Sequence, residues 1–168
     1  MHEPAPSPTP PPPKQAREVL VVDDLPEIGD FFRALLRRMH EFDIKLTTEA
    51  NSEKALDLVK SNEYDLIISD FRMRQVDGIE VLSAARTYHS DGLRVLMTGY
   101  NEIPTSMDRI REAHIDAYVQ KPLRSQDILL LIFDFLNGNR NAIDACRQEA
   151  RELETMGSHE NTARGFSA

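Results

Sequence analysis

The sequence predicts an α/β fold in which one five-stranded parallel sheet is covered by helices on both faces. Between residues 16 and 138, short apolar runs alternate with amphipathic segments five times, which is the pattern of repeated strand and helix units. Three of the runs are almost continuous in Val, Leu, Ile or Met, as in strands that are buried on both faces. The length of 168 residues fits one such domain.

The apolar runs place the strands at 18–22, 44–48, 64–69, 93–97 and 117–120. The second run, IKLTT, is the most polar of the first four, so we expect it at an edge of the sheet.

The amphipathic segments place helices at 26–39, 52–60, after Gly78, at 104–113 and at 125–136. Pro26 suits the opening turn of the first helix, and Ser52 is a good N-cap residue for the second. The fifth helix has almost no polar face. We therefore expect it to be covered on more than one side, by the segment that follows or by another protein.

The two ends of the chain differ from this central part. Seven of the first fourteen residues are proline, so residues 1–15 are expected to form a disordered tail, which serves as a spacer or as a docking strand for a partner. Residues 139–156 carry a short apolar seam at helical spacing that includes Cys146. This helix is expected to form a dimer or partner contact, or to pack back onto the fifth helix, and 157–168 is expected to be disordered.

Composition narrows the possible functions. The chain has 20 Lys and Arg against 28 Asp and Glu, and no basic stripe with interleaved aromatic residues, so no direct contact with nucleic acid is expected. The sequence has no apolar run near the roughly 20 residues of a membrane-spanning helix, and it has no signal peptide. We therefore expect a cytoplasmic location and no membrane insertion. One cysteine and five scattered histidines do not suit a zinc site.

Reactive side chains follow four of the predicted strands: Asp23 and Asp24, then Asp70, Thr98 and Lys121. In an open parallel sheet, ligands bind outside the carboxyl ends of the strands, so these side chains should converge at one edge. Carboxylates that are crowded together repel each other unless a cation joins them. Mg²⁺ is the natural candidate, because it prefers oxygen ligands and is often held by one or two carboxylates with a phosphate oxygen.

Four sequence blocks occur in this order: VLVVDD at 19–24, DLIISDFRM with VDG at 65–78, VLMTG at 95–99 and YVQKP at 118–122. Together they resemble the receiver domain of two-component response regulators, of the single-domain, chemotaxis-regulator-like type, over residues 16–137. The resemblance implies a doubly wound, flavodoxin-like fold.

The resemblance also implies roles for individual residues. Asp70 corresponds to the phosphate acceptor, and Asp23 and Asp24 to the acidic pair that holds Mg²⁺ together with Asp70. The backbone carbonyl of Arg72 corresponds to a further metal ligand. Thr98 and Lys121 correspond to the residues that contact the phosphoryl group, and Tyr118 corresponds to the aromatic residue that changes rotamer with Thr98.

This resemblance leads us to expect a phosphorelay switch and not a turnover enzyme, apart from Mg²⁺-dependent self-phosphorylation and autodephosphorylation. The donor would be a sensor histidine kinase or a histidine phosphotransfer protein. The signal would reach a downstream protein through helix four, strand five, helix five or the C-terminal helix, and a homodimer is one option.

Three positions near the expected site stand out. Arg74 occupies the place where a proline usually follows the methionine, so the loop at 72–77 is expected to be less rigid. Arg72 and Tyr100 border the phosphoryl site and are bulky. We expect them to hinder the attacking water and to prolong the phosphorylated state.

Other interpretations remain open from the sequence. A phosphatase of the haloacid dehalogenase type also uses Asp, Thr, Lys and an acidic pair, but its Asp-x-Asp nucleophile motif comes first in the chain, and here Asp23 and Asp24 precede Asp70. A receiver-like adaptor that works without phosphorylation, or the input module of a longer regulator, would carry the same blocks.

Overall fold

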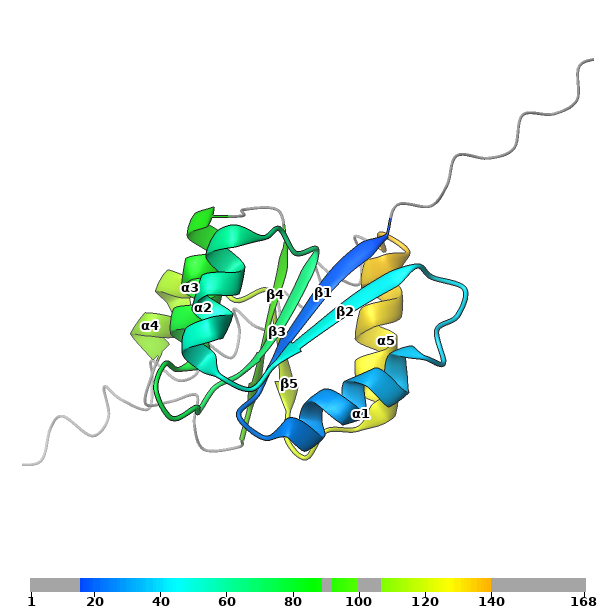
Figure 1. Ribbon diagram of the computed structural model, residues 1–168, viewed down its shortest axis with the longest axis horizontal. Helices are drawn as coiled ribbons and strands as arrows, with labels where there is room; N and C mark the ends of the chain where they lie inside the picture. Colours follow the sequence, from blue (N-terminus) through cyan, green and yellow to red (C-terminus); the bar gives the residue numbers. More distant parts are fainter. Residues whose placement is uncertain (1–15, 89–91, 100–106, 140–168) are drawn as a thin grey trace, which may run out of the picture.

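The computed structural model describes residues 16–88, 92–99 and 107–139. They form one parallel sheet in the order β2-β1-β3-β4-β5, as expected for the doubly wound, flavodoxin-like arrangement (Figure 1). The strands are β1 (Arg17–Val22), β2 (Ile44–Glu49), β3 (Leu66–Asp70), β4 (Leu93–Thr98) and β5 (Ala117–Gln120). The helices are α1 (Pro26–Leu36), α2 (Ser52–Ser61), α3 (Gly78–Tyr88), α4 (Met107–Ala113) and α5 (Ser125–Leu136).

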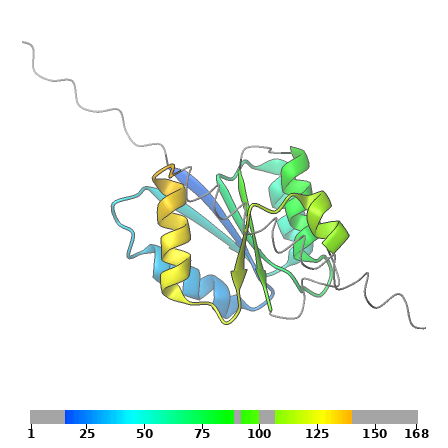
Figure 2. The ribbon, with the colours of Figure 1, turned by 180° about the vertical axis from the view of Figure 1, so that it is seen from behind.

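Helices cover both faces of the sheet, with α1 and α5 on one side and α2, α3 and α4 on the other (Figures 1 and 2). Successive residues of a strand point to opposite faces, so β1 contributes to two cores. Val19 and Val21 belong to the core under α1 and α5, whereas Leu20 and Val22 belong to the core under α2, α3 and α4. All four are at most 1% exposed, which explains the continuous apolar run.

The prediction that the second strand lies at an edge is confirmed, since β2 pairs only with β1 in the described sheet. Most element boundaries lie within two residues of those predicted. Helix α1 ends earlier than expected, at Leu36, because the chain then tightens into turns in which Met39 N donates to Leu36 O at 2.9 Å. Met39 is nevertheless buried, as the periodicity predicted.

The prediction of Ser52 as the N-cap of α2 is wrong. Asn51 occupies that position, and its side chain accepts a hydrogen bond from Lys54 N at 2.9 Å. Ser52 is buried as the first helical residue, and its hydroxyl accepts a hydrogen bond from Val76 N at 3.0 Å. The two residues are adjacent and both suit a cap, so local sequence could not separate them.

Helix α5 packs its buried residues Ile128, Ile132 and Leu136 on the sheet, but it is not enclosed on all sides within the described residues. Leu130 is 61% exposed and Phe133 is 44% exposed. The ring of Phe133 nevertheless packs edge to face against the ring of Phe42, with 5.9 Å between the ring centres. At the far end of the helix, the guanidinium carbon of Arg17 lies 6.0 Å from the centre of the Phe135 ring. The start of β1 and the end of α5 are therefore neighbours.

The predicted tails at 1–15 and 157–168, the predicted helix at 139–156 beyond its first residue, and the predicted start of the fourth helix at Pro104 lie outside the described residues. No helix in the described part of the chain has the length and apolar character needed to cross a membrane.

Candidate functional site

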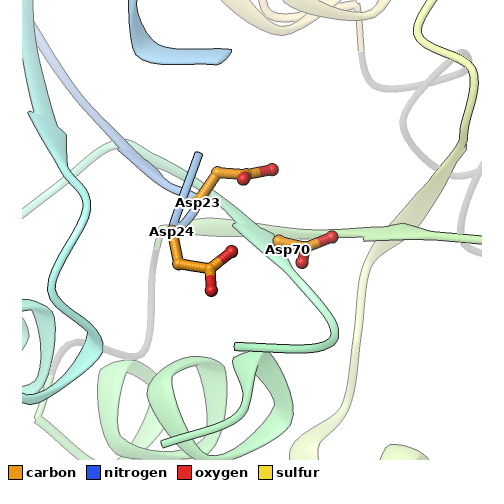
Figure 3. A group of neighbouring side chains, drawn as sticks. All are labelled: Asp23, Asp24 and Asp70. Atoms are coloured by element: carbon orange, nitrogen blue, oxygen red, sulfur yellow. The ribbon is translucent and has the colours of Figure 1, made fainter. Parts of the chain in front are cut away.

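The carboxyl edge of the sheet brings together the acidic residues that the sequence placed there. Asp23 and Asp24 directly follow β1, and Asp70 is the last residue of β3, its neighbour in the sheet. Figure 3 shows the three side chains side by side at the ends of these two strands. One carboxylate oxygen from each lies within 4.8 Å of the others, so the predicted cluster is formed.

Backbone contacts fix the position of Asp23. Its N–H donates to Glu49 O at 3.3 Å, which continues the β1–β2 ladder by one residue. Its carboxylate oxygen Oδ1 accepts a hydrogen bond from Leu25 N at 3.0 Å. The other oxygen, Oδ2, is left to face the cluster. Asp23 is 4% exposed and Asp70 is 7% exposed, so both carboxylates are largely removed from water.

Lys121 connects these two buried carboxylates. Its Nζ lies 2.9 Å from Asp23 Oδ2 and 2.6 Å from Asp70 Oδ1. The backbone places it there, because Lys121 N donates to Thr98 O at 2.9 Å directly after β5. Burial by itself would lower the pKa of Lys121, but the hydrogen bonds and charges of Asp70 and Asp23 outweigh burial and raise that pKa. Lys121 therefore stays charged across the physiological range.

This raised pKa predicts a loss of stability in alkali. A lysine whose pKa is higher in the folded state than in the unfolded state stabilises the fold fully below its ordinary pKa of 10.5, and this contribution disappears as the pH rises through the folded pKa. In the presence of a chelator, the free energies of unfolding of the wild type and of Lys121→Met should therefore differ most below pH 10.5, and the difference should shrink as the pH is raised above that value. A difference that stays constant over this range would contradict the assignment.

The other predicted residues are placed as follows. Thr98 ends β4 and is 2% exposed, and its hydroxyl donates to Gly99 O at 3.2 Å. Tyr118 on β5 is half-buried, lies beside Leu96 in the ladder and packs on the core under α2, α3 and α4. Arg72 is exposed, with its guanidinium carbon 5.9 Å from the centre of the Phe71 ring. The role of its carbonyl stays a prediction, and Tyr100 lies outside the described residues.

The loop between β3 and α3 is tied to its surroundings at three points. Arg74, which stands in place of the usual proline, donates from Nε to Asp24 Oδ2 at 3.3 Å. Val76 N donates to Ser52, as described above. Asp77 caps α3 by accepting from Glu80 N at 3.0 Å, and its other oxygen lies 2.6 Å from Arg109 Nη1 on α4. These contacts hold a loop that was expected to be less rigid for want of the proline.

Gly78 is required by a close approach that the sequence did not reveal. A Cβ atom at this position would lie 2.0 Å from the carbonyl oxygen of Asp70 and 2.9 Å from Ser69 Oγ. The first turn of α3 therefore rests directly on the backbone of the candidate phosphate acceptor. The sequence signalled a glycine before a helix, but not which backbone it would touch, since this depends on how α3 returns to the sheet.

The donor set of the cluster fits Mg²⁺. Carboxylate oxygens are preferred ligands of this ion, and protein sites usually supply only a few of them while water and phosphate oxygens complete the shell. Asp23, Asp24 and Asp70 provide three carboxylates at the required proximity. The neighbouring cations, Lys121 and the exposed Arg74, carry less positive charge than these three groups carry negative charge. A divalent cation is therefore attracted to this edge.

Comparison with known proteins gives the same family. The family model described as response regulator receiver domain matches residues 19–133. The transcriptional regulatory protein ZraR of Klebsiella oxytoca is 29% identical over 73% of this chain, which spans 27% of the length of ZraR. The chemotaxis protein CheY of Halobacterium salinarum is 30% identical over 72% of this chain and 98% of its own length.

A solved structure agrees with these relatives. The signal receiver domain of an HD domain-containing protein from Pseudomonas fluorescens is 28% identical, with a TM-score of 0.65 over 76% of this chain and 99% of that one. The family match covers more than half of the chain. The five-stranded sheet and the acidic edge described above agree with this family. The chain therefore belongs to the receiver domain family of two-component response regulators, whose members act as phosphorylation-regulated switches.

Proposed function

We propose that this domain accepts a phosphoryl group on Asp70 and passes the signal on through protein contacts. The observation that carries the proposal is the position of Lys121 Nζ, 2.6 Å from Asp70 Oδ1 and 2.9 Å from Asp23 Oδ2. This ammonium group joins the candidate nucleophile to the candidate metal-binding pair. The donor in this proposal is a phosphohistidine of a sensor kinase or of a histidine phosphotransfer protein.

The residues of the site suit phosphoryl transfer. A carboxylate oxygen of Asp70 forms the new bond to phosphorus while the bond from phosphorus to the donor's imidazole nitrogen breaks, and the imidazole keeps the electron pair. Transfer of this kind depends on position and on positive charge around the phosphoryl oxygens. Lys121 provides one such charge from a fixed position. Mg²⁺, held by Asp23, Asp24, Asp70 and the carbonyl of Arg72, would neutralise further charge on the phosphoryl oxygens.

Thr98 and Tyr118 form the proposed two-state element of the switch. The Thr98 hydroxyl, which now donates to Gly99 O, would turn to donate to a phosphoryl oxygen on Asp70. Tyr118 lies on the neighbouring strand and is only half-buried, so its ring has room to change rotamer. The readout surface in this proposal comprises α4, β5 and α5, on which Leu130 is 61% exposed.

An alternative is that the domain is the input module of a longer regulator. It is favoured by the ZraR match, in which this chain spans 27% of the relative's length. The CheY match, which covers 98% of the relative's length, favours a receiver that acts alone. Both interpretations use the same chemistry at Asp70, so the first experiment addresses that chemistry.

The test is intact-mass spectrometry after incubation with acetyl phosphate, with Mg²⁺ and with a chelator. We expect the wild type to gain one phosphoryl group that needs Mg²⁺ and is released by hydroxylamine, as an acyl phosphate should be. Asp70→Asn should gain none, and Asp57→Asn, which changes an exposed carboxylate on α2, should behave as the wild type.

Two results would contradict this proposal. One is an adduct that persists in Asp70→Asn. The other is the absence of any adduct together with no thermal stabilisation by beryllofluoride and Mg²⁺, a stable mimic of the phosphoryl group. This second result would favour an adaptor that works without phosphorylation.

A further inference from the structure

Two cationic side chains form ion pairs with different carboxylates of the acidic cluster. Lys121 pairs with Asp23 and Asp70, whereas Arg74 Nε lies 3.3 Å from Asp24 Oδ2. The side chain of Asp24 is 22% exposed and that of Arg74 is 81% exposed. Asp24 is thus the most accessible carboxylate of the cluster, and its partner is a side chain that can move into solvent.

The contact does not hold the loop in place by itself. Val76 N donates to the hydroxyl of Ser52 at 3.0 Å. Gly78 N donates to Phe71 O at 3.0 Å, and the carboxylate of Asp77 forms an ion pair with Arg109. These contacts use backbone groups and the side chains of Ser52, Asp77 and Arg109, and none of them uses the side chain of Arg74. Removing the guanidinium group should therefore change the charge next to Asp24 without releasing the loop.

From these observations we infer that Arg74 is a built-in counter-ion of Asp24 that competes with Mg²⁺ for this carboxylate. The guanidinium group of Arg74 carries a full positive charge next to this carboxylate. A divalent cation that binds Asp24 must displace this guanidinium or tolerate its repulsion. Arg74 therefore weakens the affinity for Mg²⁺ and raises the Mg²⁺ concentration at which Asp70 becomes ready for phosphorylation. The inference rests on the proposed metal site and deepens it.

The size of the effect follows from the exposure of the pair. Exposed ion pairs contribute little, because water and salt screen them and because long side chains lose freedom when they are held. We expect Arg74→Gln to lower the dissociation constant for Mg²⁺ by about two- to fivefold at low ionic strength. The ratio between the two proteins should shrink as monovalent salt is added.

The experiment is a titration with Mg²⁺ alone, without phosphodonor. Binding is measured by calorimetry and by the changes in the backbone amide chemical shifts of Asp23, Asp24 and Asp70. Arg74→Lys keeps the charge and should bind Mg²⁺ nearly as the wild type does. Arg109→Gln is the matched control, since it removes the same charge from an exposed arginine paired with Asp77, beside the same loop. Asp24→Asn should weaken binding and identify the site.

The outcomes separate the two proposals. Tighter Mg²⁺ binding by Arg74→Gln than by Arg109→Gln, with Arg74→Lys near the wild type, supports the counter-ion role. Equal affinities of Arg74→Gln and Arg109→Gln overturn this role and leave the metal site intact. If the wild type and all variants fail to bind Mg²⁺, both the counter-ion role and the proposed metal site are wrong.

Discussion

Replacing Gly78 by alanine is expected to lower the free energy of unfolding by about 3 kcal/mol, the upper end of the usual cost of overpacking. The new methyl group would lie 2.0 Å from the carbonyl oxygen of Asp70, and this atom is backbone, so no flexible side chain can move aside. Either the first turn of α3 or the end of β3 has to shift. Urea denaturation measures the loss of stability directly.

The same substitution should also slow phosphorylation of the molecules that remain folded, because the backbone that positions Asp70 is displaced. Even a small displacement of a reacting group is costly, so we expect roughly tenfold slower labelling by acetyl phosphate.

Two controls make this result specific. In Gly92→Ala the Cβ would lie 2.4 Å from Tyr64 O at the opposite end of the sheet, so this variant should lose stability and keep its labelling rate. In Gly29→Ala the nearest contact is a side-chain atom of Thr48 at 3.2 Å, so its stability should change by no more than about 1 kcal/mol. A Gly78→Ala protein that is as stable as Gly29→Ala would contradict the close approach.

Replacing Asp116 by alanine is expected to cost about 3–5 kcal/mol of stability, because it leaves a buried guanidinium without its counter-charge. Arg94 and Asp116 are 7% and 6% exposed, and Asp116 Oδ2 lies 3.1 Å from Arg94 Nη2. The same carboxylate oxygen accepts hydrogen bonds from Arg94 Nε at 3.2 Å and from Arg94 N at 2.9 Å. One small side chain thus satisfies three donors where β4 and β5 begin.

A double variant distinguishes a broken pair from a pair that stabilises the fold. Replacing buried ion pairs by apolar groups is often neutral, and Arg94 Nη1 already has no hydrogen-bond partner among the described residues. Arg94→Met with Asp116→Asn removes both charges and keeps an acceptor for the backbone N–H of residue 94. We expect this protein to recover most of the stability that Asp116→Ala loses. Equal losses in both proteins would show that the intact pair of Arg94 and Asp116 stabilises the fold, and not only that leaving one charge unpaired is costly.

The sequence predicted the fold and the convergence of the candidate site residues because both follow local rules. Continuous apolar runs can only be satisfied in strands that are covered on both faces, and parallel strands bring their carboxyl ends to one edge. The convergence of Asp23, Asp24, Asp70, Thr98 and Lys121 therefore follows from their positions directly at or after the strand ends.

The features that the sequence missed depend on contacts between distant segments. Arg74 meets Asp24 across 50 positions of the chain, and Arg94 meets Asp116 across 22. Arg94 lies in a strand whose pattern is otherwise apolar, and its partner is a single acid in a loop. The exposure of Leu130 and Phe133 on α5 leaves the expected cover of this helix, by the segment that follows or by another protein, a prediction.

The contact between Arg17 and Phe135 has a practical consequence for engineering. It places the beginning of β1 and the end of α5 beside each other, while Asp23 and Asp70 mark the opposite edge of the sheet. Domains whose ends are adjacent tolerate insertion into a surface loop of a host protein. Residues 16–139 can therefore be inserted as one unit into a fluorescent or enzymatic reporter protein, with the acidic edge that carries Asp70 left open to solvent.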